Sequence, residues 1–101
     1  NFASPAAIRA VANLGAYSAA KAGVAALTRA MAAEEAANGV RVNAVAPGMI
    51  DTEQNRAAVP DPDALKWVTR EQIAEVVLFL ASGAASGITG EVVAVVGEGI
   101  E

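Results

Sequence analysis

Small and apolar residues recur at three- and four-residue spacing from about Ala16 to Ala37. This period is typical of a helix, and Gly39 follows as the expected C-cap residue. Because the first five turns carry little polar surface, we expect this helix to be covered on both sides, by its own sheet and by a neighbouring subunit.

A second helix is predicted from about residue 70 to residue 82. Thr69-Arg70-Glu71-Gln72 is a capping box, and Val68 and Ile73 are placed to form a hydrophobic staple around it. The apolar face of this helix is expected to consist of Ile73, Val76, Val77 and Leu80.

Short apolar segments between and around the helices predict strands. Residues 1–4 read as the end of one strand, Arg41 to Ala46 as a buried central strand that stops at Pro47-Gly48, and Glu91 to Val96 as a last strand. The predicted class is α/β in the order β-α-β-α-β, with three parallel strands and two long helices.

Composition narrows the possible functions. The chain has 101 residues, 54% of them hydrophobic, which suits one small folded domain and argues against disorder. With a net charge of -4 and seven Lys and Arg scattered along the chain, the sequence has no cluster of basic residues to bind nucleic acid or anionic lipid. The longest apolar run is too short to span a bilayer. The absence of Cys and His excludes thiolate metal sites, thiol nucleophiles and a Ser-His-Asp triad, so no metal site is expected.

Candidate chemistry lies near the start of the first helix. Tyr17 and Lys21 stand four residues apart and therefore share a helix face. A phenol has an unperturbed pKa of about 10, and a nearby fixed cation favours its anionic form, which suits general acid-base catalysis. Taken alone, such a pair is equally compatible with two solvated side chains on a helix surface.

Two further features favour the catalytic interpretation over a pair of solvated side chains. Ser4 precedes Tyr17 by thirteen residues, and the segment Pro47-Gly48-Met49-Ile50-Asp51-Thr52 follows the expected central strand. With Tyr17-Ser18-Ala19-Ala20-Lys21, these motifs make essentially the whole chain resemble the short-chain dehydrogenases/reductases, in particular the 3-oxoacyl-carrier-protein reductases.

The resemblance implies a partial Rossmann-like, doubly wound parallel sheet. It also implies NAD(P)-dependent interconversion of a small-molecule carbonyl and an alcohol, in a cytoplasmic homo-oligomer formed through the helices at about 16–37 and 70–82. Tyr17 would exchange the proton, Lys21 would assist it and bond the nicotinamide ribose, and Ser4 would hold the substrate oxygen. The implied catalytic residues are Ser4, Tyr17 and Lys21, and the implied cofactor-binding residues are Tyr17, Lys21, Pro47, Gly48, Ile50 and Thr52.

The connecting segments receive more general expectations. Residues 5–15 and 53–68 are predicted to be loops on the substrate side of the site. Asn43 is expected to make structural hydrogen bonds rather than to act in catalysis. Trp67 is interpreted as an aromatic packed ahead of the second helix, with a substrate-pocket wall as the alternative.

A dinucleotide-binding glycine motif is missing from the sequence. The glycine-rich stretch Gly83–Gly90 follows a predicted helix and leads into a strand, which is the reverse of the required context. Residues 1–101 are therefore expected to form a C-terminal catalytic half without the N-terminal dinucleotide-binding half, and only the nicotinamide half of NAD or NADP could contact them. Two alternatives stay open: a catalytically inactive fragment that persists as a helix-mediated oligomer, and a minimal reductase that binds part of the cofactor.

Overall fold

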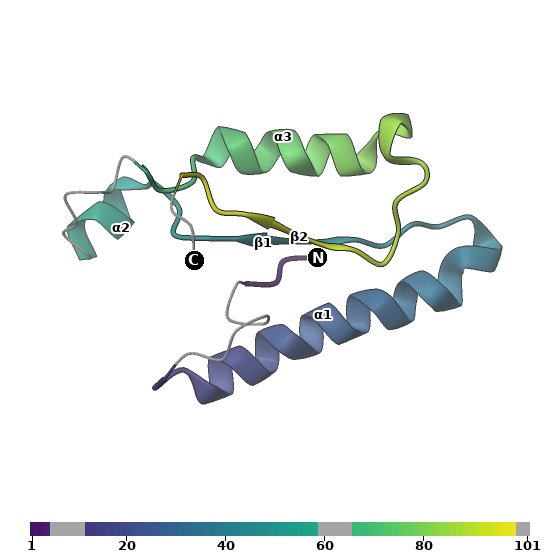
Figure 1. Cartoon of the computed structure of the whole chain (residues 1–101), viewed down its shortest axis with the longest axis horizontal. Coiled ribbons are helices and arrows are strands. Elements are labelled where there is room, and N and C mark those ends of the chain that lie inside the picture. Colours follow the sequence, from purple (N-terminus) through teal and green to yellow (C-terminus); the bar gives the residue numbers. More distant parts are fainter. Residues whose placement is uncertain (5–11, 59–65, 99–101) are drawn as a thin grey trace.

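Two helices enclose a small parallel sheet in the computed structural model, with α1 on one face and α3 on the other (Figure 1). The structure describes residues 1–4, 12–58 and 66–98. In chain order the elements are α1 (Gly15–Glu35), η2 (Ala36–Asn38), β1 (Ala44–Pro47), α2 (Glu53–Ala58), α3 (Arg70–Ala81), η4 (Gly83–Ala85) and β2 (Val92–Val95).

The sheet is parallel, with β1 in the centre. β1 pairs with β2 in a register that places Ala44 opposite Val92. On the other side of β1, Phe2 forms an isolated parallel bridge with Val45, in which the Ala3 N–H donates to the Val45 carbonyl at 2.9 Å. The α/β class and the parallel arrangement are confirmed, whereas the first of the three expected strands is reduced to this bridge among the described residues.

Successive residues of β1 face opposite layers, as strand geometry requires. Ala44 and Ala46 are buried on the α1 side, where they pack with Ala3 and Val24. Val45 is buried on the α3 side, together with Val68, Ile73 and Leu80. The sheet face toward α1 thus carries small side chains, whereas larger ones fill the space beneath α3.

The ends of the two long helices follow the predicted signals. Gly39 adopts a left-handed conformation with φ of 70° after η2, at the place expected for the C-cap. At the start of α3, the Thr69 hydroxyl oxygen accepts from the Gln72 N–H at 3.1 Å, and the Gln72 side-chain oxygen accepts from the Thr69 N–H at 2.9 Å. The capping box is therefore confirmed, and Val68 and Ile73 share one core cluster as the staple predicts.

Polar side chains shorten the strand that was expected to begin at Arg41. The Arg41 guanidinium donates to the carbonyl oxygens of Ile88 and Ser82, both at 3.2 Å. The Asn43 amide donates to the Ile88 carbonyl at 3.0 Å and accepts from the Glu91 N–H at 3.1 Å. Residues 41–43 thus hold the turn before β2 instead of extending the ladder, and the structural role predicted for Asn43 is confirmed.

The prediction of a loop at 53–68 is wrong for residues 53–58, because Glu53–Ala58 forms the short helix α2. The Thr52 hydroxyl accepts from the Asn55 N–H at 3.0 Å, which is the usual way to satisfy a first-turn donor. Trp67 is half-buried directly before Val68. The remainder of this predicted loop, 59–65, and residues 5–11 of the other one lie outside the described residues.

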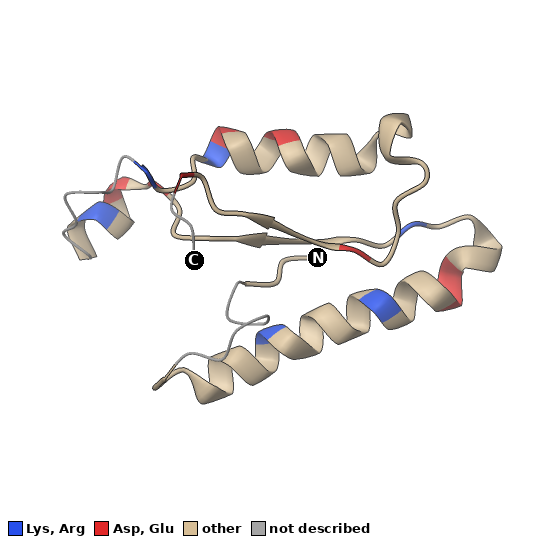
Figure 2. Ribbon diagram, viewed as in Figure 1, with Lys and Arg blue, Asp and Glu red and all other residues tan. Residues whose placement is uncertain are grey.

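Charged positions are spread over separate elements rather than gathered on one of them (Figure 2). Lys and Arg occur on α1, on α2 and at the start of α3. Helices long and apolar enough to cross a bilayer do not occur in the described ranges. The same ranges contain no group of three or more carboxylate, imidazole or thiol side chains that could hold a metal ion.

Candidate active site at the carboxyl edge of the sheet

Parallel pairing brings two of the predicted site segments to one edge of the sheet. Ser4 follows the Phe2–Val45 bridge by two residues, and Pro47 and Gly48 follow Val45 by two and three. Because these segments run in the same direction, Ser4 and the Pro47-Gly48 turn lie at the same carboxyl edge. Ligands of open parallel α/β sheets bind at this edge.

Helix α1 runs back along the amino-terminal segment and places Tyr17 near that edge. Asn1 donates through its side-chain amide to the Thr28 hydroxyl at 2.9 Å, and the Lys21 ammonium donates to the Phe2 carbonyl at 3.4 Å. Helix α1 therefore runs antiparallel to the amino-terminal segment: residues earlier in α1 lie opposite residues later in the segment. Tyr17, one turn before Lys21, is consequently directed toward the Ser4 end of the segment.

The predicted pair of Tyr17 and Lys21 does meet on the helix surface. The Lys21 nitrogen lies 6.0 Å from the centroid of the Tyr17 ring, at the outer limit of a cation–π contact. Tyr17 is 46% exposed, so its phenol is accessible to a substrate, whereas Ser4 is buried to 8% exposure. The structure brings the pair together as predicted, and the catalytic roles of Tyr17, Lys21 and Ser4 stay predictions.

The Pro47-Gly48 turn is tied to the end of β2. The Gly48 N–H donates to the Val95 carbonyl at 3.0 Å. A Cβ added at Gly48 would lie 3.3 Å from the Val96 Cα, so the backbone directly after β2 passes close to this turn. This contact fixes the point from which the chain continues toward Ile50 and Thr52.

A backbone bridge orients Ile50, the next predicted site residue. Ile50 pairs with Val68 in an isolated parallel bridge, in which Met49 O accepts from Val68 N and Asp51 N donates to Val68 O. In such a bridge the N–H and carbonyl of the central residue point away from the partner strand. The Ile50 peptide groups therefore face the opposite side, toward α2.

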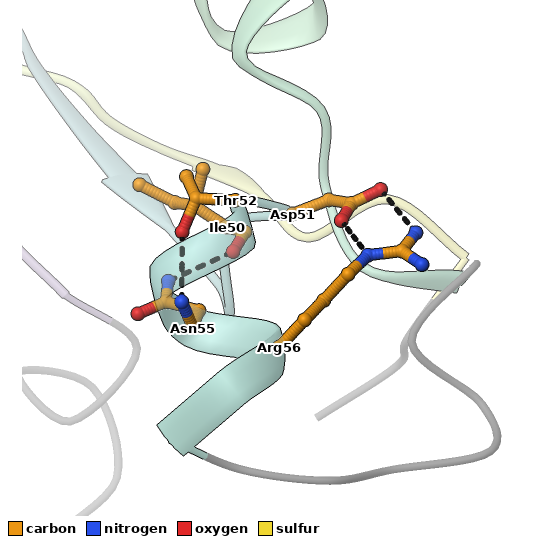
Figure 3. Close-up of polar contacts among 5 residues, drawn as sticks. All are labelled: Ile50, Asp51, Thr52, Asn55 and Arg56. Atoms are coloured by element: carbon orange, nitrogen blue, oxygen red, sulfur yellow. Dashed lines mark hydrogen bonds and ion pairs between the residues drawn. The ribbon is translucent and has the colours of Figure 1, made fainter.

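Two residues that sequence reasoning missed, Asn55 and Arg56, hold this region (Figure 3). The Asn55 side-chain amide donates to the Ile50 carbonyl at 2.8 Å, while its backbone N–H donates to the Thr52 hydroxyl. The Arg56 guanidinium binds the Asp51 carboxylate through both Nε and a terminal nitrogen, the latter at 2.9 Å. A signal existed in the sequence, because Thr52 precedes Asn55 by three residues, the spacing of an N-cap.

The ion pair also sets the charge state of Asp51. The hydrogen bond from Arg56 holds the pKa of the Asp51 carboxyl below its ordinary value of 3.8. A carboxyl with a depressed pKa stabilises the folded state above the unfolded-state pKa, and this contribution is lost as the pH falls through the folded-state value. At neutral pH the pair therefore helps to keep the first turn of α2 against the Ile50 segment.

Comparison with known proteins decides the family. The family profile described as enoyl-(acyl carrier protein) reductase matches residues 1–99. A solved short-chain dehydrogenase/reductase family protein is 41% identical with a TM-score of 0.82, covering 94% of this chain and 42% of its own length. The chain belongs to the short-chain dehydrogenase/reductase family.

Curated relatives within this family are oxidoreductases. Galactitol 2-dehydrogenase of Rhizobium johnstonii is 49% identical over 88 residues, which cover 77% of this chain and 34% of the relative. The 3-oxoacyl-acyl-carrier-protein reductase FabG of Vibrio harveyi is 45% identical over 83 residues, covering 74% and 34%. The chain thus spans about a third of the length of these short-chain dehydrogenases/reductases.

Two solved structures with similar folds contain nicotinamide cofactors. A protein of Agrobacterium tumefaciens assigned as 2-deoxy-d-gluconate 3-dehydrogenase, with bound NADP, is 37% identical with a TM-score of 0.84, covering 96% of this chain and 44% of that one. A 4-hydroxyisoleucine dehydrogenase complexed with NADH is 28% identical with a TM-score of 0.86 and the same coverage. The resemblance found from the motifs is confirmed at the level of family and fold.

Proposed function

We propose that this chain carries the substrate- and nicotinamide-facing part of an NAD(P)-dependent oxidoreductase that interconverts a carbonyl and an alcohol. The observation that supports it most is that α1, which carries Tyr17 and Lys21, is bonded to the amino-terminal segment that leads to Ser4. Lys21 is tied there through Phe2, which is two residues from Ser4. Two segments of the chain, one turn of α1 and the end of the amino-terminal segment, thus supply an acid-base phenol, a cation and a hydroxyl.

Each residue has a distinct task in this proposal. Bound NAD(P)H supplies the hydride that reduces the carbonyl carbon. Tyr17 gives its phenolic proton to the carbonyl oxygen and regains one from water, and in alcohol oxidation it takes the proton instead. Lys21 stabilises the negative charge left on the phenol oxygen, and the Ser4 hydroxyl donates to the substrate oxygen as charge develops there.

The residues after the Pro47-Gly48 turn suit the nicotinamide carboxamide. An amide needs one donor and one acceptor, and the Ile50 N–H is directed away from Val68 to supply the donor. The Thr52 hydroxyl accepts once, from the Asn55 N–H, and keeps its proton and a second lone pair for a ligand. Only the nicotinamide half is assigned to this chain, because its sequence lacks a glycine motif in strand-turn-helix context.

An activity assay tests the proposal. The purified chain is mixed with NADH or NADPH and a simple ketone, and the loss of reduced nicotinamide is compared with the amount of alcohol formed. We expect equal amounts of both, because one hydride and one proton are transferred for each alcohol. Loss of reduced cofactor without alcohol would contradict the proposal. The cytoplasmic location stays a prediction.

The exposed apolar residues of α1 and α3 favour the second candidate function, a helix-mediated oligomer without catalysis of its own. Leu27 on α1 is 56% exposed, and on α3 Leu78 and Phe79 are 71% and 45% exposed. The two helices lie on opposite faces of the sheet, so each supplies a separate surface (Figure 1). Exposed apolar groups of this kind mark association sites.

Light scattering distinguishes the oligomer from a monomer. We expect a mass of at least two chains of 10.1 kDa each. We expect Leu78→Glu to lower this mass, because a carboxylate cannot be buried unpaired at an interface. Gln54→Glu is the matched control, since Gln54 is exposed and lies on α2, outside both helices. A monomeric native chain would contradict the oligomer.

A further inference from the structure

We infer that Asn55 is a positioning residue that holds Ile50 and Thr52 in the conformation that binds the nicotinamide carboxamide. The inference rests on the proposed function, because the carboxamide site belongs to it. Asn55 itself is not expected to touch the cofactor or the substrate. Its two hydrogen bonds connect the two residues assigned to the carboxamide (Figure 3).

The first bond fixes the Ile50 peptide. The bridge to Val68 directs the Ile50 carbonyl toward α2, where the Asn55 side-chain amide donates to it at 2.8 Å. The N–H of the same residue points to the same side in a parallel bridge. Asn55 therefore immobilises the residue whose N–H would bind the carboxamide oxygen and occupies one lone pair of its carbonyl.

The second bond orients the Thr52 hydroxyl. Because the Asn55 N–H donates to the Thr52 oxygen at 3.0 Å, the hydroxyl proton is directed away from Asn55. Asn55 is half-buried, and the first turn of α2 is further held by the Arg56 N–H, which donates to the Thr52 carbonyl at 2.9 Å. The short helix thereby acts as a brace that keeps both carboxamide-binding groups in place before the ligand arrives.

Two substitutions separate the side-chain bond from the backbone bond. Asn55→Asp preserves the size of the side chain but replaces the donor with a carboxylate, which can only accept and is repelled by the Ile50 carbonyl. Asn55→Ala removes the donor without adding charge and retains a good helix former. Both keep the backbone N–H that donates to Thr52.

A neighbouring residue provides a matched control. Gln54→Glu makes the same chemical change, amide to carboxylate, at an exposed position of the same helix. Hydrogen exchange of the backbone amides of Asn55 and Arg56 shows whether α2 stays folded in each variant, since both amides are bonded to Thr52.

The test is a titration of the ¹⁵N-labelled chain with nicotinamide mononucleotide, followed through the backbone amides of Ile50 and Thr52. We expect both amides to shift in the native chain and in Gln54→Glu, and the Kd to rise about five- to tenfold in both Asn55 variants, the loss expected for one hydrogen bond. Equal Kd values in the native chain and the Asn55 variants would overturn the inference and leave the proposed function standing. An equal weakening by Gln54→Glu would also overturn it, because the effect would then belong to α2 as a whole. The absence of any shift in the native chain would overturn the proposed carboxamide site, and the inference with it.

Discussion

Tyr17→Phe is expected to lower the rate of ketone reduction by about 10²–10⁴-fold, the usual contribution of a positioned general acid. The substitution removes only the phenolic oxygen and leaves the aromatic ring beneath the Lys21 ammonium. Tyr17 is 46% exposed, so the loss of its hydroxyl leaves the fold intact. The measurement is the initial rate of loss of reduced nicotinamide with native and variant chains at equal concentration.

Ser18→Ala is the matched control for this experiment. It removes a single hydroxyl from the adjacent residue of α1, and the buried Ser18 oxygen has no hydrogen-bond partner among the described residues. We expect the native rate in this control, because the Ser18 hydroxyl is turned into the protein. An unchanged rate in Tyr17→Phe would remove the phenol from the mechanism.

Gly97→Ala is expected to lower the free energy of unfolding strongly. Gly97 has a φ of 65°, and an added Cβ would lie 2.8 Å from the Lys66 carbonyl oxygen and 2.9 Å from the Val68 nitrogen. The left-handed conformation costs a residue with a Cβ about 1–2 kcal/mol, and relieving contacts with rigid backbone costs about 1–3 kcal/mol more. The expected decrease in the free energy of unfolding, about 2–5 kcal/mol, is large for a small domain. Urea denaturation followed by circular dichroism measures it.

Gly23→Ala provides the opposite result in the same assay. Gly23 lies inside α1 with a negative φ, and an added Cβ would meet nothing within 4 Å. Replacing a helical glycine by alanine stabilises by about 0.5–1 kcal/mol, since the unfolded chain loses freedom. A Gly97→Ala variant as stable as the native chain would contradict the packing of this turn against Lys66 and Val68.

The long elements could be predicted because their signals are local. The capping box at Thr69 and Gln72 and the glycine at position 39 act within a few residues, so the sequence alone places both helix ends. The central position of β1 also followed from its apolar run. The α/β class then required only that parallel strands be joined by helices.

The strand limits could not be read in the same way, because they depend on distant partners. Arg41 and Asn43 end the ladder early by bonding Ile88 and Glu91, which lie more than 40 positions away. The first strand is short for a related reason: among the described residues its pairing consists of one bridge to Val45. A period in the sequence shows which residues favour a strand but does not show where pairing stops.

The motifs pointed to candidate site residues but not to the residues that hold them in place. Tyr17 and Lys21 share a helix face from their spacing alone, and the structure brings them together. Helix α2 and the two bonds of Asn55 were missed, since a six-residue helix between a turn and a Pro-containing segment has no periodicity to reveal it. Both Asn55 bonds are local, spanning three and five positions, but the Thr52–Asn55 spacing is the one signal for them in the sequence.

Binding of a nicotinamide at the carboxyl edge of this sheet can be measured directly by a fluorescence titration. The purified chain is titrated with NADH and with NADPH while the emission of the reduced nicotinamide is followed, beside the Thr52→Val variant. We expect a saturable change for at least one cofactor, with weaker binding in Thr52→Val because the hydroxyl is lost. A signal that stays proportional to the cofactor concentration into the millimolar range would contradict it.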